Sequence, residues 1–173
     1  MKKFILLMIL TVVWLVGCQD VAKEESTFKL EDSIKNGDVI VVDTGQSMPN
    51  TYKIYNLDKL FMFINKANGA ESSELKFINV TKDGKSVENK LSSNRGNVTF
   101  DNKFLGMKDY YLTGGGETLI GLQETKPYEC GNINASNNGV TLTQCKNEDQ
   151  NFIIVPFKTQ EFREATAKVK IKK

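Results

Sequence analysis

The first 18 residues constrain this chain more than any other part of its sequence. A positively charged start, Lys2 and Lys3, precedes an apolar run over residues 4–16, and Cys18 follows closely. This layout is typical of a secretory signal. As a helix, the apolar run would be about 20 Å long, which is short of the roughly 30 Å hydrocarbon core of a bilayer. The pattern therefore favours export of the chain over a permanent transmembrane helix.

Residues 15–18 (LVGC) resemble a bacterial lipobox. The resemblance implies that the sulfur of Cys18 carries palmitate-like acyl chains, that the leader is cut before this residue, and that the mature chain begins there. Stable anchoring needs two or more acyl chains, which a lipidated cysteine supplies. We therefore expect a lipid anchor on the extracytoplasmic face of the cell membrane. An ordinary cleaved signal with a chance cysteine, or an uncleaved helix, are the alternatives.

The charged residues remove several function classes. The chain contains no histidine, so Ser-His, Cys-His and His-based metal chemistry are excluded. Removing Lys2 and Lys3 from the 23 basic residues leaves 21, which equals the 21 acidic residues. A neutral mature chain has no general attraction to nucleic acid, so we expect no nucleic-acid partner and no cofactor.

We divide the chain into four parts. Residues 1–17 form the signal, residues 18–36 a charged tether, residues 37–158 a single folded domain, and residues 159–173 a basic tail. A short helix near residues 28–35 is compatible with the tether. The tail could contact anionic lipid or wall polymers, or it could be a solvated, frayed terminus.

The folded part shows one clear helix and several strands. Residues 56–69 begin with a capping Asn56, end with a glycine and carry apolar residues at helical spacing. Residues 38–43 are a β-branched apolar run that fits a central strand buried on both faces. Asp83-Gly84 predicts a hairpin turn. Further strands are expected near residues 75–80, 87–91, 98–104, 118–122, 139–144 and 152–157.

These elements predict an α+β fold, a small antiparallel meander sheet with one main amphipathic helix packed on it. Their order resembles an uncharacterised family of small lipoproteins from Bacillus and its relatives. The resemblance rests on residues 37–42 (GDVIVV), residues 55–60 (YNLDKL) followed by Phe63, the Asp83-Gly84 turn, and Cys130 with Cys145. The family implies an envelope location and supplies no activity. A His-Gly that we associate with the family after the first strand is replaced here by residues 43–45 (DTG), so no role of that histidine carries over.

Cys130 and Cys145 are the only thiols left once Cys18 is lipidated, and outside the membrane such a pair favours a disulfide. A two-residue turn at residues 137–138 would set these cysteines opposite each other, and would set Ile133 opposite Leu142 on the other face of the hairpin. A turn at residues 138–139 would misalign them, and a wider loop is a third alternative. A redox-active pair lacks Cys-x-x-Cys spacing, and two cysteines without histidine are too few for zinc. We therefore expect no metal site.

Two further motifs are weak. The glycine cluster at residues 114–116 could cradle an anion, but no Walker lysine or Rossmann spacing accompanies it, so a loop is the simpler interpretation. Paired carboxylates could hydrolyse a glycosidic bond without histidine. Candidates lie in the second half of the chain, and no catalytic residue is assigned among them: Asp101, Asp109, Glu117 and Glu124.

The sequence thus predicts a membrane-anchored extracytoplasmic lipoprotein whose domain is a non-enzymatic binding or accessory module of the cell envelope. Its partners would be the membrane, through the lipid anchor, and an envelope protein or wall polymer. The alternative is an extracytoplasmic hydrolase that uses carboxylates. A deep pocket with two neighbouring carboxyl groups would favour the hydrolase, and a shallow exposed patch would favour binding.

Overall fold

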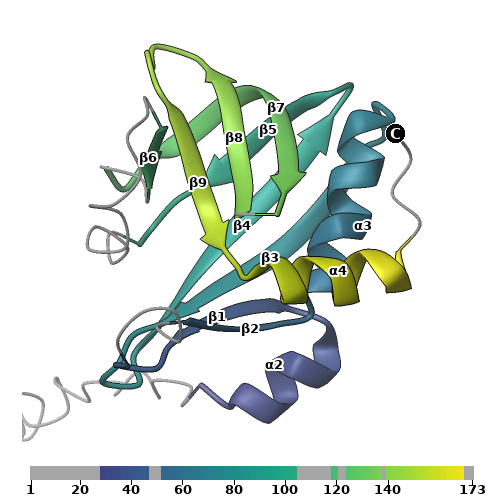
Figure 1. Cartoon of the computed structure of the whole chain (residues 1–173). Helices are drawn as coiled ribbons and strands as arrows, with labels where there is room; N and C mark the ends of the chain where they lie inside the picture. The colour runs from purple at the N-terminus through teal and green to yellow at the C-terminus, as the bar shows by residue number, and fades with distance from the viewer. Residues whose placement is uncertain (1–27, 47–51, 105–117, 121–123, 138, 170–173) are drawn as a thin grey trace, which may run out of the picture.

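Most of the described chain is β-structure, and its nine strands join into one sheet (Figure 1). The structure is a computed structural model that describes residues 28–46, 52–104, 118–120, 124–137 and 139–169, with the backbone alone at 118–120. The strand order in the sheet is β2-β1-β3-β4-β5-β7-β8-β9-β6. The strands are β1 (Val39–Asp43), β2 (Tyr52–Tyr55), β3 (Ser73–Val80), β4 (Ser86–Asn94), β5 (Asn97–Asp101), β6 (Thr118–Ile120), β7 (Pro127–Ser136), β8 (Gly139–Cys145) and β9 (Asn151–Pro156). The helices are α2 (Leu30–Asn36), α3 (Leu57–Asn68) and α4 (Thr159–Lys168).

This architecture contradicts the predicted α+β fold with a small antiparallel meander. The described chain is mostly β, its sheet curls into a nearly closed barrel (Figure 1), and three helices accompany it. The sheet is mixed, because β1 pairs parallel with β3 and β6 pairs parallel with β9. Turn motifs in a sequence indicate only antiparallel pairing between strands that are close together along the chain. Parallel neighbours are joined by longer connections, for which the sequence has no local signal.

Strand β1 behaves as its apolar run predicts. It lies between β2 and β3, and its side chains are buried on both faces of the sheet. Val39 and Val41 belong to the main core inside the curved sheet. Ile40 points to the other face, where Ile78 and Val80 form a smaller core. The two cores explain why a run without polar alternation forms a strand here.

Helix α3 fills the concave side of the sheet. It contacts β1, β3, β4 and β7, which are not all neighbours, and only a curved sheet brings them around one helix (Figure 1). Its apolar face is buried as the helical spacing predicts. The buried residues of this helix are Leu57, Leu60, Phe61, Phe63, Ile64 and Ala67.

Helix α2 covers the opposite face of β1 and β3, although it lies in the segment expected to be a tether. Phe28, Leu30 and Ile34 pack against the smaller core. The helix ends at Gly37, whose φ of 83° is the left-handed conformation that glycine adopts most easily. The sequence signal for α2 is weak because the helix is only seven residues long and half of its surface is charged.

Asn56 occupies the predicted N-cap position of α3 but does not cap the helix with its side chain. Its amide Nδ2 instead donates hydrogen bonds to the carbonyl oxygens of Ile34, at 2.9 Å, and Asp38, at 2.8 Å. Its φ of 55° is left-handed, which asparagine tolerates better than most residues. Asn56 therefore ties the end of α2 and the start of β1 to the start of α3.

This arrangement predicts that Asn56→Ala destabilises the protein more than Asn56→Gly. Both variants lose the two side-chain hydrogen bonds, at a cost of about 1–2 kcal/mol. Alanine also strains the left-handed backbone, which adds roughly 1 kcal/mol, whereas glycine does not. Urea unfolding midpoints compare the two variants, and equal midpoints would refute the proposed role of backbone conformation.

Helix α4 lies in the segment expected to be a basic tail. It follows β9 directly and crosses α3 (Figure 1). Phe162 packs against the main core, and Ala165 is buried in it. Glu161 accepts a hydrogen bond from the backbone N–H of Lys158 at 2.8 Å, which closes the first turn. The terminus is thus helical as far as Lys168, so a frayed end beginning at residue 159 does not describe it.

Candidate functional site

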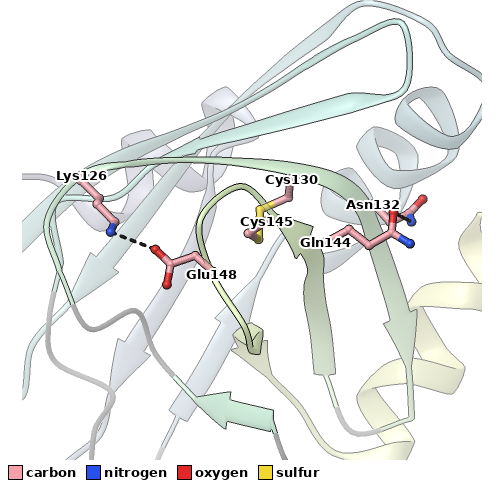
Figure 2. Close-up of a disulfide and its surroundings, with 6 residues drawn as sticks. All are labelled: Lys126, Cys130, Asn132, Gln144, Cys145 and Glu148. Atoms are coloured by element: carbon pink, nitrogen blue, oxygen red, sulfur yellow. Dashed lines mark hydrogen bonds and ion pairs between the residues drawn. A yellow bond between two sulfur atoms is a disulfide. The ribbon is translucent and has the colours of Figure 1, made fainter.

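The predicted disulfide between Cys130 and Cys145 is present, and it joins neighbouring strands β7 and β8 (Figure 2). The sulfurs lie 2.04 Å apart and the Cα atoms 3.8 Å apart. The two strands pair Cys130 with Cys145 and Ser136 with Gly139, which leaves residues 137–138 as the connection. Of the alternatives left open by the sequence, the two-residue turn at residues 137–138 therefore has the right register.

The predicted faces of this hairpin are wrong. Ile133 is paired with Leu142 as expected, but both lie in the same core as the two cysteines. Residues three apart on a regular strand point to opposite faces of a sheet. Both strands must therefore change phase between the disulfide and the Ile133–Leu142 pair.

Gln144 shows how the phase changes. Its φ of 56° breaks the regular strand conformation next to the disulfide. Opposite it, Gly131 leaves room, because a Cβ there would lie 2.8 Å from the Oε1 atom of Gln144. Asn132 then donates from Nδ2 to the same oxygen at 3.1 Å (Figure 2). This local irregularity keeps the pairing register and turns apolar side chains of both halves of the hairpin inward.

A charged cluster lies beside the disulfide. The Nζ atom of Lys126 is 2.8 Å from a carboxylate oxygen of Glu148 (Figure 2). The same atom is also 2.8 Å from a carboxylate oxygen of Glu124. The hydrogen bond to Glu124, followed by that to Glu148, raises the pKa of Lys126 well above its usual value. Burial raises the pKa of the nearby Tyr128 hydroxyl. Lys126 thus links the start of β7 to the turn after β8 and already has two carboxylate partners.

Three of the shallow grooves on the molecule are lined by described residues with charged side chains. One of about 230 Å³ lies beside the charged cluster and includes Lys146 and Glu129. A second of about 270 Å³ lies between α2 and strands β3 and β4. Its Lys76 contacts Glu88 at 2.7 Å, and this hydrogen bond is the main cause of a raised Lys76 pKa. Both grooves thus carry side chains of opposite charge that form ion pairs, and the lining of the first groove has one lysine in excess.

The third groove has a net negative charge. It measures about 200 Å³ and lies between the junction of β2 with α3 and one face of α4; we call it the helix groove. Its lining carries three carboxylates against one lysine, together with the apolar side chains of Ile54, Leu57 and Ala165. The charged residues are Asp58, Glu161, Glu164 and Lys168. This groove was not predicted from the sequence, and its one local signal is the pair of glutamates, Glu161 and Glu164, in the basic tail.

Two of the four carboxylates considered for a hydrolase, Asp101 and Glu124, lie in the described residues, and neither lines these grooves. Asp101 lies 3.3 Å from the Nζ atom of Lys103, and Glu124 contacts Lys126. Both side chains are at least 40% exposed and are already paired with a lysine, so neither lies in a buried cleft. Asp109 and Glu117 lie outside the described residues, as do Cys18 and the glycine cluster at residues 114–116.

Three asparagines that were not predicted from the sequence are buried inside the barrel. Asn89 donates from Nδ2 to Oδ1 of Asn79 at 2.8 Å, and its own Oδ1 accepts the backbone N–H of Lys103 at 2.7 Å. Asn102 donates to the backbone oxygens of Glu124 and of Phe104. These bonds satisfy the amides and fix the chain after β5, so we assign the asparagines a structural role.

Within the described ranges, no group of three or more Cys, Asp or Glu residues is arranged to hold a metal ion. No helix in the same ranges is long and apolar enough to cross a membrane. No protein-family model, curated protein or solved structure matches this chain. The resemblance to small Bacillus lipoproteins thus stays an expectation from the sequence.

Proposed function

We propose that the chain is a lipoprotein anchored through Cys18 to the outer face of the cell membrane, and that its β domain is a non-enzymatic binding or accessory module of the envelope. The observation that supports this location best is the Cys130–Cys145 disulfide. Disulfides persist outside the cytoplasm and are rare inside it. The signal layout and the cysteine at its end point to the same compartment.

The shapes of the described grooves support binding rather than hydrolysis. They are shallow and solvent-exposed, and two of them carry ion pairs between oppositely charged lining residues. A glycosidase needs two carboxylates at a defined separation across a cleft. In the helix groove, Glu161 and Glu164 accept hydrogen bonds from their own helix, from Lys158 and Gln160. These bonds favour a structural and electrostatic role over acid catalysis.

The anchor predicts that Cys18→Ser abolishes lipid labelling of the protein. Bacteria expressing the full chain would be fed an alkyne-tagged palmitate, and label on the purified protein would be measured. The wild type should carry label. The Cys130→Ser/Cys145→Ser double variant, which also removes thiols, should carry it equally. An unlabelled wild type, or label that persists in Cys18→Ser, would refute the anchor.

A further inference from the structure

The helix groove lies next to an edge of the sheet. Among the described strands, β2 pairs with β1 alone and is therefore the last strand on its side of the sheet. Such an edge presents backbone N–H and C=O groups that an extended peptide can pair with. Ile54 of β2 lines the groove, so a strand added beside residues 53–55 would place alternate side chains toward it.

The opposite wall of the groove is one face of α4. Glu161, Glu164, Ala165 and Lys168 stand at helical spacing and all line the groove. An edge strand facing a helix across a groove is the arrangement in which peptide strands are added to a sheet. The backbone of β2 would supply the pairing, and the groove would select the side chain that enters it.

The charge of the groove indicates which side chain fits. Asp58, Glu161 and Glu164 face one lysine, so the groove carries two excess negative charges. Lys53, whose charge would oppose a basic strand, is on the other face of β2, with its Nζ atom 4.9 Å from the centre of the Tyr55 ring. The apolar lining residues Ile54, Leu57 and Ala165 suit the methylene stem of a long side chain whose charged end reaches the carboxylates.

We propose that the edge of β2 and the helix groove bind an extended, lysine- or arginine-containing segment of another envelope protein. The partner pairs with residues 53–55 as an added strand and inserts a basic side chain between Asp58 and Glu164. This proposal rests on the proposed function, because it names the partner of an extracytoplasmic binding module. A failure of peptide binding would leave the palmitate-labelling result unchanged, so the two proposals fail separately.

The test uses the full-length protein extracted from its membrane in detergent. Its probe is a capped peptide of alternating valine and lysine, and its control is a peptide of alternating valine and glutamate. We expect fluorescence anisotropy to detect binding of the lysine peptide alone, weakened by added salt. We also expect slower hydrogen exchange of the peptide fragment that contains Tyr52–Tyr55, measured by mass spectrometry.

Two double variants with the same change in charge locate the site. Asp58→Asn/Glu164→Lys should weaken binding by about tenfold or more, because several exposed charge interactions are lost together. Glu129→Gln/Asp149→Lys changes exposed acids on and after the β7–β8 hairpin and should bind as the wild type does.

Four results would overturn the proposal. The first is equal binding of both peptides, or binding of neither, and the second is an equal loss of peptide binding in the two double variants. The third is an unchanged rate of hydrogen exchange at β2 when the peptide binds. The fourth is concentration-dependent dimerisation that slows hydrogen exchange at β2 without peptide. The last result would assign the edge to a second copy of this chain.

Discussion

Phe61→Ala is expected to lower the free energy of unfolding by about 3–5 kcal/mol, the usual cost of truncating a buried phenylalanine. Phe61 of α3 is 1% exposed. Its ring lies 5.8 Å from that of Phe157 and 5.6 Å from that of Phe162, with both contacts edge-to-face. One residue thus joins α3 to the end of β9 and to α4. Thermal unfolding should show a fall of roughly 10 °C or more in the midpoint.

The neighbouring Met62 provides the matched control. It lies on the same helix but is 43% exposed, so Met62→Ala should change the free energy of unfolding by no more than about 0.5 kcal/mol. If Phe61→Ala fails to fold, Phe61→Leu keeps most of the buried volume and should cost about 1 kcal/mol. Equal effects of Phe61→Ala and Met62→Ala would contradict the packing of α4 against α3.

Reduction of the Cys130–Cys145 disulfide is expected to cost about 3 kcal/mol. The bond closes a loop whose ends are 15 residues apart. In the chain-entropy model, such a cross-link lowers the entropy of the unfolded chain and so raises its free energy by about 3 kcal/mol. Thermal unfolding of the wild type with and without reductant measures the effect without altering any side chain.

A double variant controls for other actions of the reductant. Cys130→Ala/Cys145→Ala should unfold near the midpoint of the reduced wild type, and reductant should not shift it further. If reduction leaves the wild-type midpoint unchanged, the two cysteines are not joined in the folded protein.

Sequence patterns predicted the elements that have a regular period and a clear boundary. Strand β1, helix α3 and the hairpin around Asp83-Gly84 are all present. Strand β7 was missed because its apolar pattern shifts by one residue between Cys130 and Ile133, which hides the two-residue period. Strand β2 has only four residues and borders a turn-rich stretch.

Helix α4 was missed for a different reason. Its buried side is narrow, with Ala165 buried and Phe162 partly buried, and the other positions are mostly polar or charged. A contact with α3, which lies about a hundred residues earlier in the chain, decides that this segment folds. The closed curvature of the sheet depends on such distant contacts, so local patterns could not predict it.

The features of the candidate site also divide into those encoded locally in the sequence and those created by contacts between distant residues. The disulfide was predicted from two cysteines that lie within 16 residues of each other. Its register was one of three alternatives that the sequence left open, and the pairing of β7 with β8 selects the turn at residues 137–138. The helix groove combines Asp58 with Glu164, which are far apart in the sequence and are brought together only by the packing of α4. No local motif reports a groove of that kind.

The central claim is an acylated, disulfide-closed domain, and the mass of the intact protein from its native membrane tests it most directly. Thiols would be alkylated before and after reduction. We predict a chain that lacks residues 1–17, carries added acyl mass and gains two alkyl groups only after reduction. An unprocessed chain with free thiols would contradict both the anchor and the disulfide, and would place the protein in a reducing compartment.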